Sequence, residues 1–305
     1  MTEFYKIGFC FMLTYTKFIL FLMRGENHSM SHNNQKKIAV INDFSGFGRC
    51  SIAVALPIIS AMKIQCCPIP TAIFSNHTGF QSFYYKDYTQ SMKPYIAEWK
   101  KLGLQFEGID TGFLGSEEQI EIVIDFFQQF KSSHTIGIVD PVMGDNGKLY
   151  PTYSPKLASK MHRLVEYADI LTPNLTEACI LTGKGYRENY SMPELEKMCH
   201  LLSQQGPKKI VISGIQDGEY IGNFVYEQGK ESKIIRSLKI GATRSGTGDV
   251  FSSIIAGAAV NGIDFYQSVQ LATDFISKSV LKTTEMGIPD TDGICFEEFL
   301  TDLIV

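Results

Sequence analysis

The sequence predicts a single α/β domain over residues 37–305, built on a mainly parallel sheet with helices on both faces. From Lys37 onward, short apolar runs rich in β-branched residues alternate with helical patterns. This alternation is typical of parallel strands joined by crossover helices. The chain has 305 residues, and no linker, low-complexity segment or internal repeat divides this part of it. A domain of this length can bury a sizeable core.

Each expected element follows from a local pattern. The expected strands are 37–42, 66–73, 107–113, 135–140, 169–172 and 208–213, and the helices between them include 50–62, 116–131 and 192–205. The runs 220–226 and 232–238 flank "EQGKE", which predicts a hairpin and therefore antiparallel strands at one edge. Two last helices are expected near 248–261 and 264–283, the second with Asp264 as its N-cap.

Composition and charge exclude several classes of function. The net charge is −4 and no basic stripe is present, so nucleic acid is not an expected partner. The seven cysteines are an odd number and none has C-x-x-C spacing. They are therefore expected to be reduced thiols in a cytoplasmic protein.

Residues 1–36 form an N-terminal extension of different character. The apolar stretch "IGFCFMLTYTKFILFLM" is interrupted by Lys17, is short for a membrane span and lacks a clean signal-peptide cleavage site. No membrane association is expected. We favour the hypothesis that translation starts at Met30 over the alternative of a real anchor. Peptides from residues 1–22 in a mass spectrum of the native protein would contradict it.

The stretch "SGTGD", residues 245–249, comes directly before a predicted helix. Glycines let successive backbone N–H groups converge, and the helix N-terminus adds positive potential, so the stretch suits developing negative charge. Asp249 could take a proton from a hydroxyl group that attacks a phosphorus held by those N–H groups. The alternative is that Asp249 only caps the helix.

Further acids follow two other predicted strands. Asp140 and Asp145 lie in "VDPVMGDNGKLYP", at a strand's carboxyl end, where open α/β sheets bind ligands. They could hold Mg²⁺ through waters, or simply form a loop. Glu177, in "LTPNLTEACILTG", could be a surface acid or could organise metal-bound water.

The first loop, "INDFSGFGRCS", only approaches a dinucleotide-binding fingerprint. Ser51 replaces the third glycine and no acid ends the next strand, so hydride transfer is not expected, and a P-loop is absent. In "FSNHTGF", His77 alone is more often a loop or core residue, whereas Thr78 could hydrogen-bond a substrate.

Four motifs together resemble the ribokinase-like small-molecule kinases and, among them, the pyridoxal kinases. "SNHTG", "DPVMGD", "LTPNLTEACILTG" and "GTGDVF" occur in that family's order over nearly all of residues 37–300. The resemblance implies a three-layer α/β/α sandwich and a homodimer. It also implies ATP as co-substrate, with Mg²⁺ and a monovalent cation such as K⁺.

The resemblance also implies roles for particular residues. Asp249 would be the catalytic base. The other implied positions are an anion hole (Gly246, Thr247, Gly248), ATP contacts (Asp140, Tyr150, Thr172, Asn174, Glu177, Ser213), metal contacts (Asp140, Asp145, Glu177) and substrate contacts (Asp43, Ser45, Thr78). Two departures affect the choice of substrate. The segment "NDFSG" is similar to hydroxymethylpyrimidine kinases, and Phe113 stands where several relatives carry tyrosine.

The expected reaction is therefore ATP-dependent phosphorylation of the 5′-hydroxymethyl group of pyridoxal, pyridoxamine or pyridoxine. One alternative is hydroxymethylpyrimidine kinase activity on the same fold. Another is a non-catalytic vitamer-binding protein. The acids Asp249, Asp145 and Glu177 are evidence against this alternative, because such a protein would not need all three.

Overall fold

The computed structural model describes residues 30–304. The chain divides into two units between Asn34 and Gln35, and every described helix and strand lies in the second. The expected start at Met30 and the alternative anchor concern residues 1–29, which lie outside the described residues. Within residues 30–304, no helix is long and apolar enough to cross a membrane.

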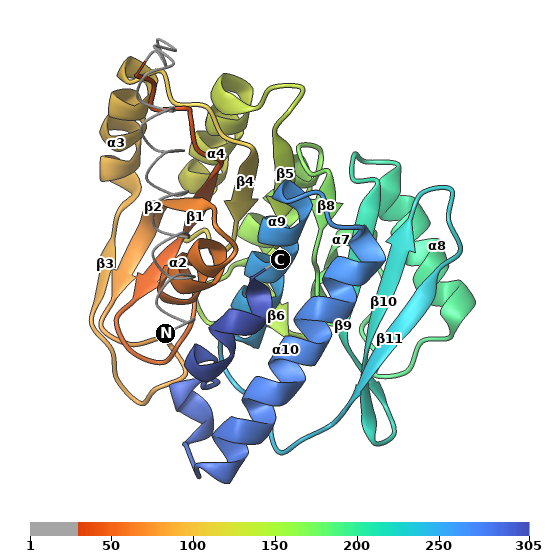
Figure 1. Cartoon of the computed structure of the whole chain (residues 1–305). Coiled ribbons are helices and arrows are strands. Elements are labelled where there is room, and N and C mark those ends of the chain that lie inside the picture. Colours follow the sequence, from red (N-terminus) through yellow and green to blue (C-terminus); the bar gives the residue numbers. More distant parts are fainter. Residues whose placement is uncertain (1–29, 305) are drawn as a thin grey trace, which may run out of the picture. The chain divides into compact units, whose positions relative to one another are not determined.

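Nine strands of the described chain form one sheet, in the order β11-β10-β9-β8-β5-β4-β1-β2-β3 (Figure 1). The parallel strands are β1 (Lys37–Ser45), β2 (Gln65–Phe74), β4 (Gly108–Thr111), β5 (Ile136–Val139), β8 (Ile170–Leu171) and β9 (Lys209–Asp217). The antiparallel strands are β10 (Tyr220–Glu227) and β11 (Lys233–Leu238) at one edge and β3 (Tyr85–Asp87) at the other. The predicted mainly parallel sheet and the predicted hairpin are confirmed. Strand β3 was not predicted, because three exposed residues carry no periodicity.

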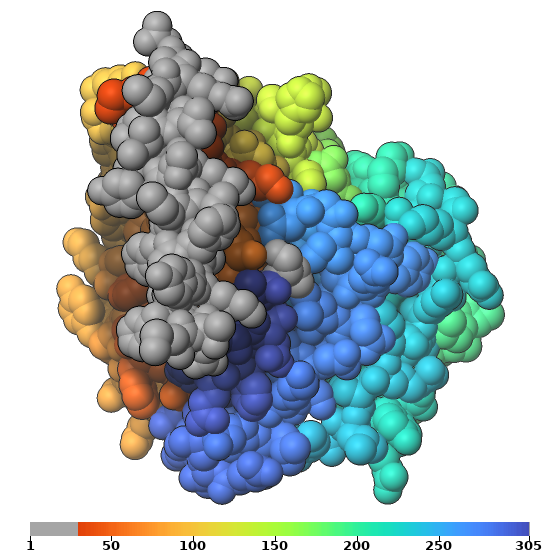
Figure 2. All heavy atoms as spheres, viewed as in Figure 1, coloured from red at the N-terminus to blue at the C-terminus, as the bar shows by residue number. Residues whose placement is uncertain are grey.

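Helices cover both faces of the sheet. One face carries α2 (Ile52–Ala61), α9 (Thr247–Val260) and α10 (Phe265–Glu285). The other carries α3 (Thr89–Lys101), α4 (Glu117–Phe130), α5 (Pro155–Lys160), α6 (His162–Val165), α7 (Leu175–Thr182) and α8 (Met192–Ser203). Buried apolar side chains form two clusters, one on each side of the sheet. The expected three-layer sandwich is therefore confirmed. Figure 2 shows the surface of α10, in blue, beside the cyan strands β10 and β11.

Smaller elements complete the fold. A two-stranded hairpin is made of β6 (Gly144–Asp145) and β7 (Lys148–Leu149), and the 3₁₀ helices η1 (Asp290–Asp292) and η2 (Glu297–Leu303) follow α10. Helix α10 begins after Asp264, whose Oδ1 accepts the N–H groups of Tyr266 and Gln267. The predicted cap is therefore confirmed.

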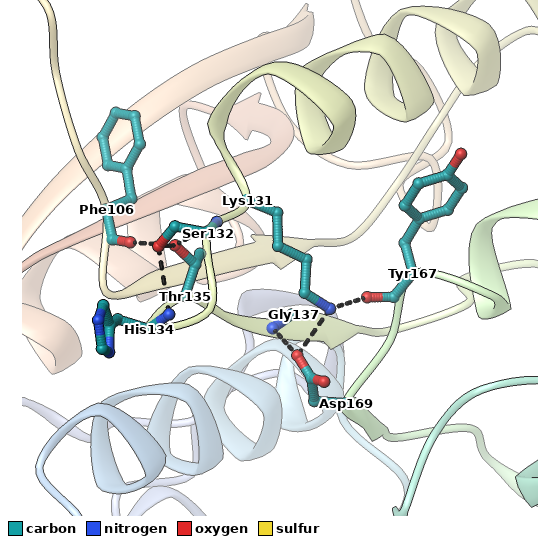
Figure 3. Close-up of polar contacts among 8 residues, drawn as sticks. All are labelled: Phe106, Lys131, Ser132, His134, Thr135, Gly137, Tyr167 and Asp169. Carbon is teal, nitrogen blue, oxygen red and sulfur yellow. Dashed lines mark hydrogen bonds and ion pairs between the residues drawn. The ribbon is translucent and has the colours of Figure 1, made fainter.

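A polar network fixes the amino ends of the central strands (Figure 3). Lys131, after α4, donates from Nζ to the carbonyl of Tyr167 at 2.7 Å and pairs with Asp169 at 2.8 Å. Asp169 accepts the N–H of Gly137 in β5 at 2.7 Å. The network ties α4 to the starts of β5 and β8. The carboxyl ends of the same strands, where the candidate site residues follow, lie at the opposite end of the sheet.

Candidate active site

A pocket of about 400 Å³ opens where the parallel strands end. Its wall includes most of the residues that the sequence singled out, from seven separate segments of the chain. They are Asp43, Ser45, Thr78, Asp140, Tyr150, Thr172, Asn174, Glu177, Ser213, Gly246, Gly248 and Asp249. His77 and Phe113 also line it. The fold thus gathers residues spread over more than 200 positions of sequence into one cavity.

Two predicted site residues, Thr247 and Asp145, do not line the pocket. Thr247 is the first residue of α9, and its hydroxyl donates to the carbonyl of Arg244 at 3.2 Å. Asp145 lies in β6, and its carboxylate accepts the backbone N–H of Asn146 at 2.8 Å.

Asp249 lies in the first turn of α9, but it does not occupy the capping position. The N-cap is Gly246, so the alternative that Asp249 serves as the N-cap is wrong. Instead its Oδ1 accepts a hydrogen bond from another segment, from Nδ2 of Asn42 at 3.1 Å. Burial raises the pKa of Asp249, while the backbone N–H of Ser51, the side chain of Asn42 and the nearby His77 act in the opposite direction.

Asn42 is a site residue that the sequence analysis did not identify. Its Oδ1 accepts the N–H groups of Phe113 at 2.8 Å and of Asp43 at 2.9 Å, while its Nδ2 holds Asp249. One amide thus connects β1, the loop after β4 and α9. The available signal was an asparagine at the end of an apolar strand, directly before an acid.

Glycine is present at positions 246 and 248, on either side of Thr247, for two different physical reasons. At Gly246, φ is +78° and a Cβ atom would lie 1.9 Å from the carbonyl oxygen of Arg49. A Cβ at Gly248 would meet nothing within 4 Å. Gly246 is therefore required by the fold, whereas Gly248 keeps the backbone open toward the pocket. The first N–H groups of a helix have no partner within it, so this turn can accept an anion.

The loop after β1 is braced by Asp43. Its carboxylate oxygens accept the hydroxyl groups of Ser51 at 2.6 Å and Ser45 at 2.9 Å. Burial raises the pKa of Asp43 to about 6. Arg49 and Ser51 have φ values of 47° and 58°, which non-glycine residues rarely adopt, so the brace holds a strained segment against the glycine turn.

Glu177 joins the two acid-bearing segments through backbone contacts. Its Oε1 accepts the N–H of Met143 at 3.0 Å, and its Oε2 accepts that of Asn174 at 2.9 Å. With the Asn174 side chain it forms a capping box at the start of α7. Burial raises the pKa of Glu177 to about 8. Nδ2 of Asn174 donates to the carbonyl of Gly144 at 2.8 Å, which fixes the hairpin β6–β7 beside the pocket.

The acid-rich side of the pocket could accept a cation. The Asp140 carboxylate forms no hydrogen bond with any residue that the structure describes. Burial and the nearby Glu177 raise its pKa well above the ordinary value. Thr172 Oγ1 is buried without a partner among residues 30–304. No group of three His, Cys, Asp or Glu side chains in the described part of the chain could ligate a metal by itself. The donor set therefore fits Mg²⁺ that keeps waters and phosphate oxygens as its other ligands.

Aromatic rings also line the pocket. Phe113 packs edge-on against Phe74, with ring centroids 6.0 Å apart, and His77 packs against Phe80 at 4.7 Å. Nε2 of His77 lies 2.7 Å from the carbonyl oxygen of Thr291, which fixes the ring at the pocket wall. A flat, partly apolar ring ligand would match this wall.

Comparison with known proteins identifies the family of the chain. Residues 56–292 match the phosphomethylpyrimidine kinase family. The chain belongs to this family. Its fold is also that of the ribokinase-like proteins, as the motifs predicted.

Individual members of the family carry two kinds of name. A pyridoxal kinase of Arabidopsis thaliana is 31% identical over 210 residues, which cover 62% of this chain and 63% of that relative. The chain thus spans less than two thirds of that enzyme. A hydroxymethylpyrimidine/phosphomethylpyrimidine kinase of Aquifex aeolicus is 25% identical over 256 residues, covering 82% of this chain and 90% of the relative.

A solved structure shows the same fold at higher identity. It is a protein of Bacteroides thetaiotaomicron named as a candidate phosphomethylpyrimidine kinase, 38% identical, with a TM-score of 0.88. The match covers 90% of this chain and 96% of that one. A second crystal form of the Bacteroides protein was solved with pyridoxal.

Proposed function

We propose that this protein is an ATP-dependent kinase that phosphorylates the 5′-hydroxymethyl group of pyridoxal, pyridoxamine or pyridoxine. The observation that carries the proposal is the position of Asp249. Its buried carboxylate lies in the pocket wall, in the same helical turn as Gly246 and Gly248. A proton acceptor and an anion-binding turn are thus adjacent, as transfer of a phosphoryl group to an alcohol requires.

The chemistry follows from this adjacency. Asp249 takes the proton of the substrate hydroxyl group while the oxygen of that hydroxyl group forms a bond to the γ-phosphorus of ATP. The bond from that phosphorus to the β,γ-bridging oxygen breaks, and ADP leaves. The N–H groups of the turn at residues 246–248 stabilise the charge on the transferred group. Phosphoryl transfer depends mainly on such positioning and charge neutralisation.

Other residues at the site have proposed roles toward ATP, Mg²⁺ and the substrate. We propose that Tyr150, Thr172, Asn174 and Ser213 contact ATP. Asp140, with Asp145 and Glu177, would hold Mg²⁺, which neutralises phosphate charge when it is bound. Asp43, Ser45 and Thr78 remain proposed substrate contacts. Because Ser45 and Ser51 already donate to Asp43, any contribution of Asp43 to the substrate is in addition to its bracing role.

Two observations favour a vitamin B6 compound as the alcohol. The Bacteroides protein, 38% identical, was solved with pyridoxal, and the Arabidopsis pyridoxal kinase is 31% identical. The second candidate substrate is hydroxymethylpyrimidine. The match to the phosphomethylpyrimidine kinase family and the first-loop segment "NDFSG" favour it.

One set of measurements separates the candidates. Values of kcat/KM should be determined for pyridoxal, pyridoxamine, pyridoxine and hydroxymethylpyrimidine, with ATP and Mg²⁺ in the presence of K⁺. The proposal expects the highest value for a B6 compound. A higher value for the pyrimidine would assign the second function. Tight pyridoxal binding without any turnover would instead indicate a binding protein.

A further inference from the structure

One buried carboxylate near Asp249 has no role in the proposed mechanism. It belongs to Asp110 in β4, which is 5% exposed. In the sheet register Asp110 lies between Val40 of β1 and Ile138 of β5, and both of these side chains belong to the apolar cluster beneath α9. An apolar side chain at position 110 would complete this row. Packing alone therefore does not account for an acid at this place.

Among the described residues, one side chain donates a hydrogen bond to the Asp110 carboxylate. The hydroxyl of Ser252, one turn after Asp249 in α9, donates to its Oδ1 at 3.3 Å. Burial, with a smaller contribution from the charge of Asp249, raises the pKa of Asp110 to about 7, and the hydrogen bond from Ser252 acts in the opposite direction. Ser252 therefore links the carboxylate to the helix that carries Asp249.

Asp110 and Asp249 both line a small cavity. It has a volume of about 10 Å³, and its other lining residues include Asn42, Thr111, Asp140 and Ser252. This volume corresponds to about one water molecule, and a buried water needs two to four polar partners. Thr111 is 1% exposed, and its hydroxyl has no partner among residues 30–304. The cavity thus has a water's size and supplies an unpaired donor.

We propose that this cavity binds one water molecule that hydrogen-bonds to both Asp110 and Asp249, which makes Asp110 a positioning residue for Asp249. The water donates one hydrogen to each carboxylate and accepts the hydroxyl hydrogen of Thr111. Asn42 donates a hydrogen bond to Oδ1 of Asp249 from β1, and the water donates a second hydrogen bond to the same carboxylate from the cavity. The proposal rests on the proposed function, in which Asp249 is the base.

Two substitutions at position 110 test the role. Asp110→Leu completes the apolar row and removes the water's partner, and it also removes the cost of burying an unpaired ionisable group. We expect kcat to fall about 10- to 100-fold, because a small displacement of a catalytic group has costs of this order. The KM values and the melting temperature should stay near those of the wild type. Asp110→Asn, which keeps the shape, should give a smaller fall.

Serine substitutions supply the matched comparison. Ser252→Ala should lower kcat, because it removes the donor that orients Asp110. Ser279→Ala in α10 removes an equally buried hydroxyl, which donates to the carbonyl of Phe275 at 2.9 Å, and should leave kcat unchanged. An unchanged kcat in Asp110→Leu would overturn the proposal. So would a fall in kcat accompanied by a raised KM and a lowered melting temperature. If Asp110→Leu does not fold, Asp110→Asn decides by the same criteria.

A crystal structure of the wild-type protein at high resolution tests the water independently of turnover. Density for a water within hydrogen-bond distance of both carboxylates would support the proposal, and its absence would overturn it. A wild-type enzyme inactive on every alcohol tested would contradict the proposed function instead, and the crystal structure would still decide the water site.

Discussion

Nδ2 of Asn42 donates a hydrogen bond to Oδ1 of Asp249 over 3.1 Å, which joins β1 to the first turn of α9. The two residues are 207 positions apart in the chain. The carbonyl oxygen of the same amide accepts the N–H of Phe113. The orientation of the proposed base therefore depends on an amide that is itself held by the substrate wall.

Replacing Asn42 by alanine should impair catalysis more than a matched substitution elsewhere. Asn42→Ala frees the Asp249 carboxylate and leaves the N–H of Phe113 without its acceptor, so kcat should fall at least 10-fold. The unpaired groups should also lower the free energy of unfolding by about 1–3 kcal/mol. The control is Asn223→Ala, which removes an equally buried amide that donates to Thr273 at 2.9 Å. The control should lose stability and keep kcat; equal kcat in both variants would refute the role of Asn42.

The glycine turn offers a second matched pair. Gly246→Ala forces a Cβ atom onto the Arg49 carbonyl and an unfavourable φ, so the melting temperature should drop sharply. Gly248→Ala meets no protein atom, and alanine is favoured over glycine within a helix by up to about 1 kcal/mol. Its melting temperature should hold or rise, while kcat/KM for ATP should fall because the methyl group enters the space of the phosphoryl group. Normal kinetics in Gly248→Ala would contradict an anion site at this turn.

Substitutions of Glu177 and Asp145 should distinguish an effect on Mg²⁺ binding from an effect on the stability of the fold. Glu177→Gln replaces an oxygen that accepts a backbone N–H with an NH₂ group. Both stability and Mg²⁺ dependence should therefore suffer. Asp145→Asn loses only a contact to its neighbour Asn146, so it should raise the Mg²⁺ concentration needed for half-maximal rate and leave the melting temperature unchanged. Titrating Mg²⁺ in kinetic assays of both variants checks this. An unaltered requirement in both would remove these acids from the metal site.

Asp43 predicts a pH effect on stability. Its pKa is raised from 3.8 to about 6 in the folded protein, so the folded state binds the proton more tightly than the unfolded state. The resulting stabilisation is complete below pH 3.8 and is lost as the pH rises through 6, by roughly 3 kcal/mol at most. Asp43→Asn lacks this loss. Its melting temperature should therefore rise relative to that of the wild type between pH 4.5 and 7.5, and parallel curves for the two proteins would be inconsistent with a protonated Asp43.

Most of the architecture could be predicted because its signals are local. The β-branched run of β1 and the acid before α10 are readable from a few residues. By contrast, β3 is three exposed residues that pair with β2 only after an intervening loop, so no local pattern predicts it.

The candidate site divides in the same way. Asp249 was identifiable because glycines surround it in the sequence. Asn42 and Asp110 act through partners more than 100 positions away, and a single polar residue in a strand carries no sign of such a partner. The Glu177 carboxylate accepts two backbone N–H groups. One of them belongs to Met143, directly before β6, so this contact likewise depends on tertiary structure.

The central claim is that Asp249 is the base, and Asp249→Asn tests it most directly. The variant keeps the size of the side chain and an oxygen that can accept the hydrogen bond from Asn42, but it cannot accept the substrate proton. A positioned general base contributes about 10²- to 10⁴-fold in rate, whereas loss of one hydrogen bond costs about 1 kcal/mol of stability. Measured together with melting temperature and ATP affinity, kcat should fall by at least 100-fold while the other two stay close to wild type. A near-normal kcat with a lowered melting temperature would contradict the account and leave Asp249 a structural residue.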